Sequence, residues 1–361
     1  MIPISALLPQ ELAATLQLDP AYRGKQIFSW IHDRLVFDFS AMGNLPADLR
    51  RNLAGRALPV GLKEEARLED ADGTVKFRFR LLDGQAVESV ILRDPKGRVT
   101  ACLSTQVGCA MGCLFCRTGS LGFSRDLSAH EIVDQFLLLR SCTAANAAPS
   151  DGGGPVSREP ASSPDISSVV FMGMGEPLAN LDNLQQAVEV LSCGGFSQRR
   201  ITVSTCGLVE GIGLLGSRKM AVRLAISLIS ADSKVRTRLM PINRSNPLPQ
   251  LRRALLDYQQ ILGKRITLEI VLMAGINDRP EDVEALVRFV RGGDGRSLKV
   301  LVNLIPWNPL PEFPYKRPEP RRIEWFEQRI RQAGIPVTTR ISRGSAVCGA
   351  CGQLGLTTPR E

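Results

Sequence analysis

Six short apolar runs rich in β-branched residues recur after residue 98, and helical stretches separate them. This alternation is typical of a parallel sheet covered by crossover helices. The predicted strands are 99–104, 168–173, 200–205, 222–227, 266–272 and 298–306. Six units are too few for an eight-stranded barrel, so we predict an α/β fold, a partial (β/α)6 TIM-like barrel. Functional groups in such folds lie at the carboxyl ends of the strands.

Two further elements are expected before the barrel. The stretch RGKQIFSWIHDRL, at 23–35, spaces its apolar residues as one face of a helix does. An ordinary amphipathic helix packed on the main core gives the same spacing as a separate helical domain. Residues 74–92 alternate apolar and polar side chains around Asp83-Gly84, which predicts a β-hairpin with a tight turn.

The chain therefore divides into four predicted parts. They are a basic helical RNA-binding accessory domain (1–60), a β-hairpin extension (61–98), the barrel (99–345) and a C-terminal segment (346–361). Within the barrel, residues 144–164 are rich in Ala, Ser, Gly and Pro and predict a flexible surface insertion.

Charge and composition narrow the class of protein. Lys and Arg outnumber Asp and Glu by 45 to 36, which favours a polyanionic partner such as RNA, although ordinary solubility charge is the simpler alternative. No run is long enough to span a bilayer and the start has no cationic leader, so we expect a cytoplasmic protein without a membrane partner. In that compartment nine cysteines are expected to be metal ligands or catalytic thiols. The only two histidines, His32 and His130, exclude a histidine-rich zinc site.

Three cysteines follow the first predicted strand in CAMGCLFC: Cys109, Cys113 and Cys116. Soft thiolates select zinc, copper(I) or iron–sulfur clusters. A zinc site of four cysteines would need a fourth ligand, which Cys348 or Cys351 of CGAC offers. A [4Fe–4S] cluster on three cysteines would instead leave one iron open to a substrate or cofactor. The spacing alone leaves both alternatives open.

The C-x3-C-x2-C spacing, with an aromatic residue before the last cysteine, resembles the signature of radical S-adenosylmethionine (SAM) enzymes. In that superfamily the open iron is chelated by SAM. GMGEP, at 173–177, resembles the glycine-rich turn whose backbone meets the SAM amino group, with Gly175 and Glu176 at the matching positions. Without the cysteines this turn would be a weak signal.

A narrower resemblance covers nearly the whole chain outside 144–164. ACLSTQVGCAMGCLFCRTG, FMGMGEP, VSTCG, MPINR, IPWNP and ACGQL occur in the order found in the rRNA and tRNA adenine-C2 methyltransferases, and YRGKQIFSWIH is similar to their N-terminal helical domain. The resemblance implies methylation of an adenine in the peptidyl-transferase centre of 23S rRNA, with an adenosine beside the tRNA anticodon as a further candidate. It also implies a [4Fe–4S] cluster, two SAM per turnover and an electron donor such as flavodoxin or ferredoxin. We expect a monomer.

Roles for three residues follow from this resemblance alone. Adenine C2 is electron-poor, so SAM's electrophilic methyl group cannot be delivered to it by simple displacement. Cys351, in ACGQL, matches the cysteine that SAM methylates and whose methylene radical adds to C2. Cys102 matches the cysteine that releases the RNA from its covalent intermediate by forming a disulfide with Cys351. Glu88 matches the acceptor of the C2 proton. Standing alone, Cys102 would be a small buried residue and Glu88 an exposed strand carboxylate.

Further SAM contacts are carried over by position. They are Ser204, Ser227, Leu228, Ile229 and Asn308. Each alone would more often be a turn or capping residue. Family members usually have Ser-Leu-His where this chain has Ser227-Leu228-Ile229. The histidine ring, which could hydrogen-bond near the cofactor ribose, is therefore absent. We expect weaker SAM binding with activity retained through backbone contacts.

Four other cysteines have no role in the resemblance. Cys348 could form an unproductive disulfide with Cys351, and Cys142, Cys193 and Cys206 are interpreted as buried small residues. Two alternative functions stay open. One is the related adenine-C8 methyltransferase that confers antibiotic resistance, and the other is a non-enzymatic RNA-binding protein with a cysteine-metal site.

Overall fold

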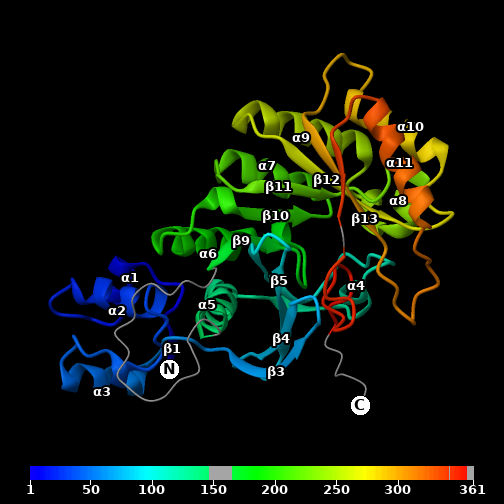
Figure 1. Ribbon diagram of the computed structural model, residues 1–361. Helices are drawn as coiled ribbons and strands as arrows, with labels where there is room; N and C mark the ends of the chain where they lie inside the picture. The colour runs from blue at the N-terminus through cyan, green and yellow to red at the C-terminus, as the bar shows by residue number, and fades with distance from the viewer. Residues whose placement is uncertain (146–164, 341, 356–361) are drawn as a thin grey trace.

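The computed structural model describes residues 1–145, 165–340 and 342–355 (Figure 1). Ten strands form one sheet in the order β14-β13-β12-β11-β10-β9-β6-β5-β4-β3. All neighbours from β6 to β14 pair in parallel, whereas β5, β4 and β3 continue the sheet in antiparallel fashion. The sheet thus combines a parallel barrel part with an antiparallel extension.

All six predicted barrel strands are present. They are β6 (Val99–Cys102), β9 (Ile166–Phe171), β10 (Ile201–Thr205), β11 (Arg223–Ser227), β12 (Ile266–Leu272) and β13 (Val300–Pro306). A seventh parallel strand, β14 (Val337–Thr339), pairs with β13 and was not predicted, because three residues are too few for a pattern to show.

A helix lies in every crossover between the parallel strands, so helices cover the outer face of the sheet (Figure 1). They are α4 (Arg117–Ser120), α5 (Ala129–Ala145), α6 (Leu181–Cys193), α7 (Val209–Ser217), α8 (Ser233–Leu239), α9 (Leu248–Leu262), α10 (Pro280–Arg291) and α11 (Pro320–Gln332). In α10, buried Val283, Leu286 and Val290 lie three or four residues apart, which is the spacing of one helix face. The predicted α/β partial barrel is confirmed.

The predicted hairpin is also present. β4 (Val75–Arg80) and β5 (Ala86–Arg93) pair antiparallel around Asp83-Gly84, and β5 pairs with β6, which joins the hairpin to the barrel sheet. β3 (Lys63–Glu69) adds an edge strand that was not predicted, since its sequence KEEARLE is almost wholly exposed and shows no apolar alternation.

The N-terminal part contains the expected helices. They are α1 (Pro9–Thr15), α2 (Arg23–His32) and α3 (Ala47–Arg56), with a small parallel pair of β1 (Ile2–Pro3) and β2 (Ala57–Leu58). Ile27 and Ile31 of α2 are fully buried in the same apolar core that fills the barrel. The imidazole of His32 is buried as well, which lowers its pKa to about 4.

Short elements complete the fold. They are β7 (Gln106–Gly108), β8 (Phe123–Asp126) and the 3-10 turns η1 (Phe39–Ala41), η2 (Pro177–Asn180), η3 (Gln198–Arg200) and η4 (Pro241–Arg244). The predicted insertion at 144–164 lies outside the described residues, apart from the end of α5 at Ala145. Within the described part of the chain, none of the helices is both long and apolar enough to cross a membrane.

Candidate functional site

The loop that carries the three cysteines, residues 109–122, leaves and re-enters the fold through one antiparallel pair, β7 and β8. The amide of Cys109 donates to the carbonyl of Gly122 at 2.7 Å and closes the loop at its base. Gly108 has φ +78°, and a Cβ there would lie 2.0 Å from that carbonyl oxygen, so only glycine fits. The cysteines therefore lie beyond the carboxyl end of β6, as predicted.

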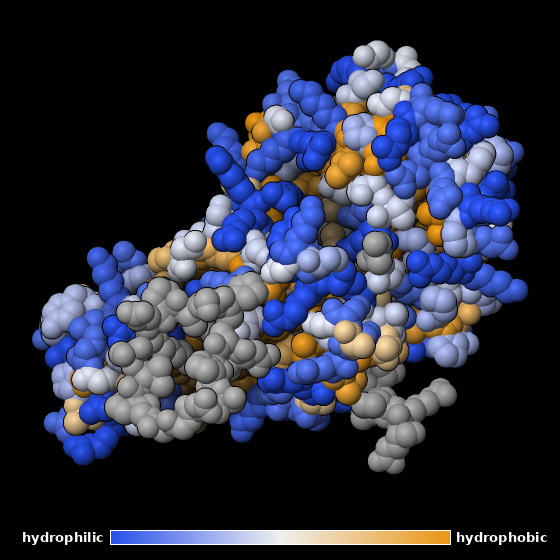
Figure 2. All heavy atoms as spheres, in the orientation of Figure 1, coloured by the Kyte–Doolittle hydropathy of each residue, from blue (hydrophilic) through white to orange (hydrophobic). Residues whose placement is uncertain are grey.

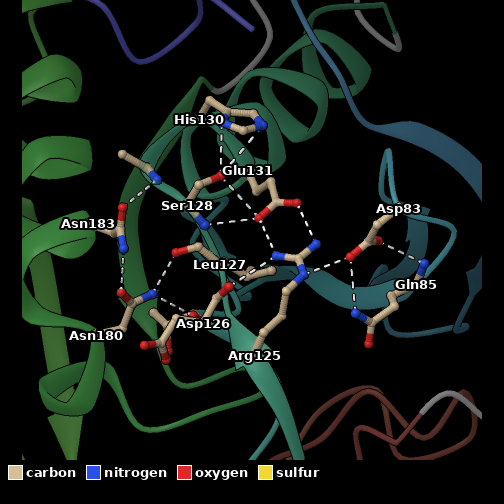
Figure 3. A network of polar contacts seen from close by, with 12 residues as sticks. Asp83, Gln85, Arg125, Asp126, Leu127, Ser128, His130, Glu131, Asn180 and Asn183 are labelled. Carbon is tan, nitrogen blue, oxygen red and sulfur yellow. Dashed lines mark hydrogen bonds and ion pairs between the residues drawn. The ribbon is translucent and has the colours of Figure 1, made fainter.

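A polar network around the partly exposed Arg125 anchors the base of this loop (Figure 3). Arg125 of β8 makes a bidentate ion pair with Glu131 of α5, with both N–O distances 2.8 Å, and its Nε donates to Asp83 Oδ2 at 2.7 Å. The Arg125 guanidinium lowers the pKa of Asp83 to about 2. The exit strand of the loop is thus tied to α5 and to the turn of the β4–β5 hairpin. The sequence indicated Asp83 only as a turn residue.

The thiols of Cys109, Cys113 and Cys116 are half-buried and close enough to influence one another electrostatically. Burial raises the pKa of Cys109 to about 11 and also raises those of the other two, so without a metal the thiols are protonated. Nowhere in 1–145, 165–340 or 342–355 are three or more Cys, His, Asp or Glu side chains arranged to hold a metal ion. The three loop cysteines therefore do not converge on one metal position, either alone or with Cys348 or Cys351 as a fourth ligand. Their thiol groups are nevertheless the ligand type of an iron–sulfur site.

The GMGEP turn packs directly on β7. Gly175 has φ +104°, and a Cβ there would lie 2.6 Å from the Cβ of Gln106. The Gln106 side chain accepts a hydrogen bond from the amide of Glu176 at 2.8 Å. The Glu176 carboxylate in turn accepts from the amide of Cys206, just after β10, at 2.7 Å. This turn therefore joins the carboxyl ends of β9 and β10 beside the cysteine loop.

Ser204 of β10 and Ser227 of β11 are half-buried near the carboxyl ends of their strands. Leu228 and Ile229 follow Ser227, and both side chains are buried. The Ile229 amide donates to the carbonyl of Glu269 at 3.1 Å, and its own carbonyl accepts from Asn277 at 2.8 Å. The N–H of Ile229 is thus already used within the protein, so only its carbonyl, which has a second lone pair, is left for the expected backbone contact with SAM.

Ile229 has φ +62°, a left-handed conformation that is unfavourable for a β-branched residue. Its side chain belongs to a second apolar cluster at this end of the barrel, with Phe115, Met240, Met273 and Trp307 among its members. The partly buried Cys113 and Cys116 pack against the same cluster. Apolar side chains thus surround two of the predicted metal ligands, which limits their contact with water.

Sequence reasoning missed a buried cation at this end of the barrel, Arg236. It donates to the carbonyl oxygens of Cys206 at 2.6 Å and Ser227 at 3.0 Å, and also to that of Leu228. Burial lowers its pKa to about 10. Arg236 therefore cross-links the ends of β10 and β11, and it lies just before MPINR, a motif that had marked only the family resemblance.

The C-terminal segment is seated on the cysteine loop. The amide of Arg117 donates to the carbonyl of Gly352 at 2.9 Å, and the hydroxyl of Thr118 donates to the carbonyl of Leu354 at 2.6 Å. Asn308 Nδ2 donates to the carbonyl of Cys351 at 3.1 Å, while its Oδ1 is buried without a hydrogen-bond partner among the described residues. Cys351 is thereby fixed from two sides.

Glu88 holds the same segment from the hairpin side. Its side chain is 1% exposed, so the simpler expectation of an exposed strand carboxylate is wrong. Its Oε2 accepts from the amide of Gly355 at 2.9 Å, and its Oε1 lies 3.2 Å from Nζ of the equally buried Lys76. Lys76 and Glu88 are diagonal neighbours on paired strands, which lets the ion pair form across β4 and β5.

Cys102 and Cys351 line one cavity of about 670 Å³. Cys102 is the last residue of β6, and burial, with a contribution from Cys351, raises its pKa to about 12. Arg340 Nη1 lies 3.8 Å from Cys351 Sγ, and Arg340 also interacts electrostatically with the buried Glu269. Burial raises the pKa of Glu269 to about 7. Sequence reasoning identified the cysteine pair but neither Arg340 nor Glu269.

All nine cysteines are free. Cys206 is buried as predicted, whereas Cys142 is half-buried and Cys193, at the end of α6, is exposed, so the prediction for Cys193 is wrong. Cys348 is half-buried in the turn that precedes Cys351.

Comparison with known proteins agrees with this geometry. Residues 15–58 match the family described as the ribosomal RNA large subunit methyltransferase N-terminal domain. A probable dual-specificity RNA methyltransferase RlmN of Treponema pallidum is 41% identical over 98% of this chain and 97% of its own length. Its counterpart from Moorella thermoacetica is 42% identical over the same shares of the two chains. The crystal structure of a radical SAM methyltransferase from Sphaerobacter thermophilus superposes with a TM-score of 0.89 and 40% identity, covering 98% of this chain and 99% of that one.

A partial parallel barrel whose first strand leads into a three-cysteine loop, together with this full-length structural match, defines a radical SAM methyltransferase. Within that class, the chain belongs to the RlmN family of dual-specificity RNA methyltransferases.

Proposed function

We propose that this protein methylates C2 of an adenine in 23S rRNA, and an adenosine of tRNA, through a cysteine that carries the transferred carbon. The observation that carries the proposal is that Cys102 and Cys351, far apart in sequence, line one cavity, and that the segment holding Cys351 is bonded to the cysteine loop. A methyl carrier and a resolving thiol need this proximity to each other.

The residues present suit a [4Fe–4S] cluster and SAM in their chemistry. Cys109, Cys113 and Cys116 would hold the cluster, since three thiols on one loop leave one iron for another ligand. Gly175, Glu176, Ser204, Ser227, Leu228, Ile229 and Asn308 are the proposed SAM contacts, and the buried Oδ1 of Asn308, unpartnered within the described ranges, is available to a donor. When bound, such a cluster supplies the electron that cleaves SAM, and flavodoxin or ferredoxin is the expected electron source.

Cys102 acts after the carbon has been joined to the RNA. A thiolate of Cys102 attacks the sulfur of Cys351, so that an S–S bond forms and the S–C bond breaks. The carbon leaves with the bonding electron pair and takes a proton as the methyl group. Burial is the main cause of the raised pKa of Cys102, and the guanidinium of Arg340 acts in the opposite direction and favours the thiolate. A reductant then restores both thiols.

Glu88 is the proposed acceptor of the C2 proton. Its carboxylate is buried beside the C-terminal segment and has a counter-charge in Lys76, 3.2 Å away. The same carboxylate accepts from Gly355, so movement of the C-terminal segment would free one oxygen for the proton.

The test is mass spectrometry of nucleosides from 23S rRNA and tRNA of cells with and without the gene. Gene-dependent 2-methyladenosine in both RNAs supports the proposal. Gene-dependent 8-methyladenosine alone would assign the C8 reaction instead. One zinc per chain, no cleavage of SAM with dithionite and no modified adenosine would point to a non-enzymatic RNA-binding protein.

A further inference from the structure

The cavity that contains the two cysteines is strongly basic. Its lining includes six arginines and one acidic residue: Arg93, Arg98, Arg200, Arg223, Arg340, Arg343 and Asp94. Asp94 is already paired with Arg98, at 2.6 Å from its Nε. On the face drawn in Figure 2, hydrophilic side chains surround a recess over strands β10 to β13. Such a concave surface of one charge attracts a polyanion.

Most of these arginines lie at the edge of the sheet opposite to the cysteine loop. Arg98 directly precedes β6, Arg200 directly precedes β10, and Arg223 is the first residue of β11. Because these strands are parallel, all three side chains start from the amino edge, whereas Cys102 ends β6. The cavity therefore extends from an arginine-lined amino edge to the two thiols.

The guanidinium groups at this edge are only partly used inside the protein. Arg200 Nε donates to the carbonyl of Ser167 at 2.8 Å, and its guanidinium lies over the ring of Phe196, which orients the side chain without neutralising it. Arg223 is exposed and makes no ion pair or side-chain hydrogen bond with any residue in the described ranges. Ser167 and Ser168 line the cavity beside them, but their hydroxyls are already hydrogen-bonded within the sheet, that of Ser167 to the carbonyl of Val99 and that of Ser168 to Thr100, each at 2.8 Å.

We propose that this arginine-lined edge, defined by Arg98, Arg200 and Arg223, is the entrance for the RNA substrate. The guanidinium groups bind phosphates of the single-stranded nucleotides that flank the target adenine. Arginine suits this role because its guanidinium is a charged, planar donor that fits a phosphate group. The adenine then enters the cavity, whose volume lies within the ~300–1,000 Å³ range of small-molecule sites and suits one extruded nucleotide. RNA thus enters from the edge opposite to the cysteine loop. The inference rests on the proposed function for the identity of the substrate.

The experiment measures binding of a fluorescein-labelled RNA stem-loop with an unpaired adenine in its loop, by fluorescence anisotropy at about 50 to 200 mM salt. The full-length reconstituted protein is compared with Arg223→Ala, Arg200→Ala and Arg223→Lys. The matched control is Arg253→Ala, since Arg253 is an exposed arginine of α9 that does not line the cavity. Thermal unfolding of each variant verifies that it is folded.

We expect Arg223→Ala and Arg200→Ala to bind about three- to tenfold more weakly, with the salt slope lowered by about 0.7 for each lost phosphate contact. Arg223→Lys keeps the charge but not the planar donors, so it should bind more tightly than Arg223→Ala and no more tightly than the parent protein, and the control should bind as the parent does. Unchanged affinity and slope in both alanine variants would overturn the proposal. Cleavage of SAM by dithionite without RNA should be equal in all variants. Weaker binding in a protein that never methylates RNA would refute the proposed function and leave this entrance standing.

Discussion

Arg340 places a guanidinium nitrogen 3.8 Å from the sulfur of Cys351, and the two residues are brought together by the strand β14 and the turn that follows it. The same guanidinium is influenced by Cys102 and Glu269, so one cation serves both thiols of the proposed reaction and one buried carboxyl group. We expect Arg340 to position the side chain of Cys351 and to balance negative charge that develops on the two sulfur atoms during the reaction.

Replacing this cation is therefore expected to slow the chemistry of Cys351. In Arg340→Met the sulfur of Cys351 loses the guanidinium that lies 3.8 Å from it and that stabilises negative charge developing there as the sulfur reacts, so iodoacetamide should alkylate Cys351 roughly three- to tenfold more slowly at neutral pH. Peptide mass spectrometry of Cys351 over time measures this rate. Arg340→Lys keeps the positive charge and should recover part of the alkylation rate. An unchanged rate in Arg340→Met would show that Arg340 does not position Cys351.

Glu269 should give the protein a measurable pH dependence of stability. Its pKa is about 7 in the folded protein, above its ordinary value of 4.5, so the folded state holds the proton more tightly. Stability from this group is present below about pH 4.5 and is lost as the pH rises to about 7. Glu269→Gln should remove this loss, which amounts to roughly 2–3 kcal/mol.

The measurement is the difference in unfolding free energy between Glu269→Gln and the parent protein from about pH 5 to pH 8. Taking the difference cancels other groups, including His32, whose lowered pKa gives a slope of the opposite sign. A difference that is constant across this range would show that Glu269 keeps an ordinary pKa.

The network around Arg125 should matter for retention of the cluster. In Arg125→Met the ion pairs to Glu131 and Asp83 are lost, and we expect a loss of roughly 1–2 kcal/mol in stability because the carboxylate of Glu131 is left buried. The loop base should loosen, so less iron should remain after gel filtration of reconstituted protein. Arg51→Met is the control, because Arg51 and Asp48 form an exposed pair worth little. Equal iron retention in both variants would argue against an anchoring role.

Ile229→His tests whether the absence of a histidine ring at position 229 weakens the binding of SAM. Histidine adopts a left-handed backbone more readily than a β-branched residue does, so φ +62° should be retained. We expect SAM to bind more tightly to the reconstituted variant, by about two- to tenfold for one added hydrogen bond. Isothermal titration measures the affinity, and Ile229→Leu, which adds no ring, is the control. Tighter binding by both variants, or by neither, would contradict the expectation.

The parallel strands and the hairpin could be predicted because their β-branched runs and their alternation reflect burial within each segment. β3 could not, because KEEARLE is exposed on an edge. Cys193 was misplaced because it ends α6 on the exposed face of the helix, although Val190 and Leu191 in the same turn are buried. The cysteines were recognisable by spacing. Arg236 and Arg340 were not, since each owes its role to partners from other strands, which only the folded chain brings near.

The pairing of the two thiols is tested most directly with Cys102→Ala, incubated with RNA, SAM and reductant and run on a denaturing gel. A shifted band should appear, and mass spectrometry should place the RNA on Cys351, because no second thiol can break the S–C bond. The band should be absent from Cys351→Ala, which should retain its iron, and from the double variant. An active parent protein whose Cys102→Ala variant forms no adduct, or an adduct that persists without Cys351, would contradict this account.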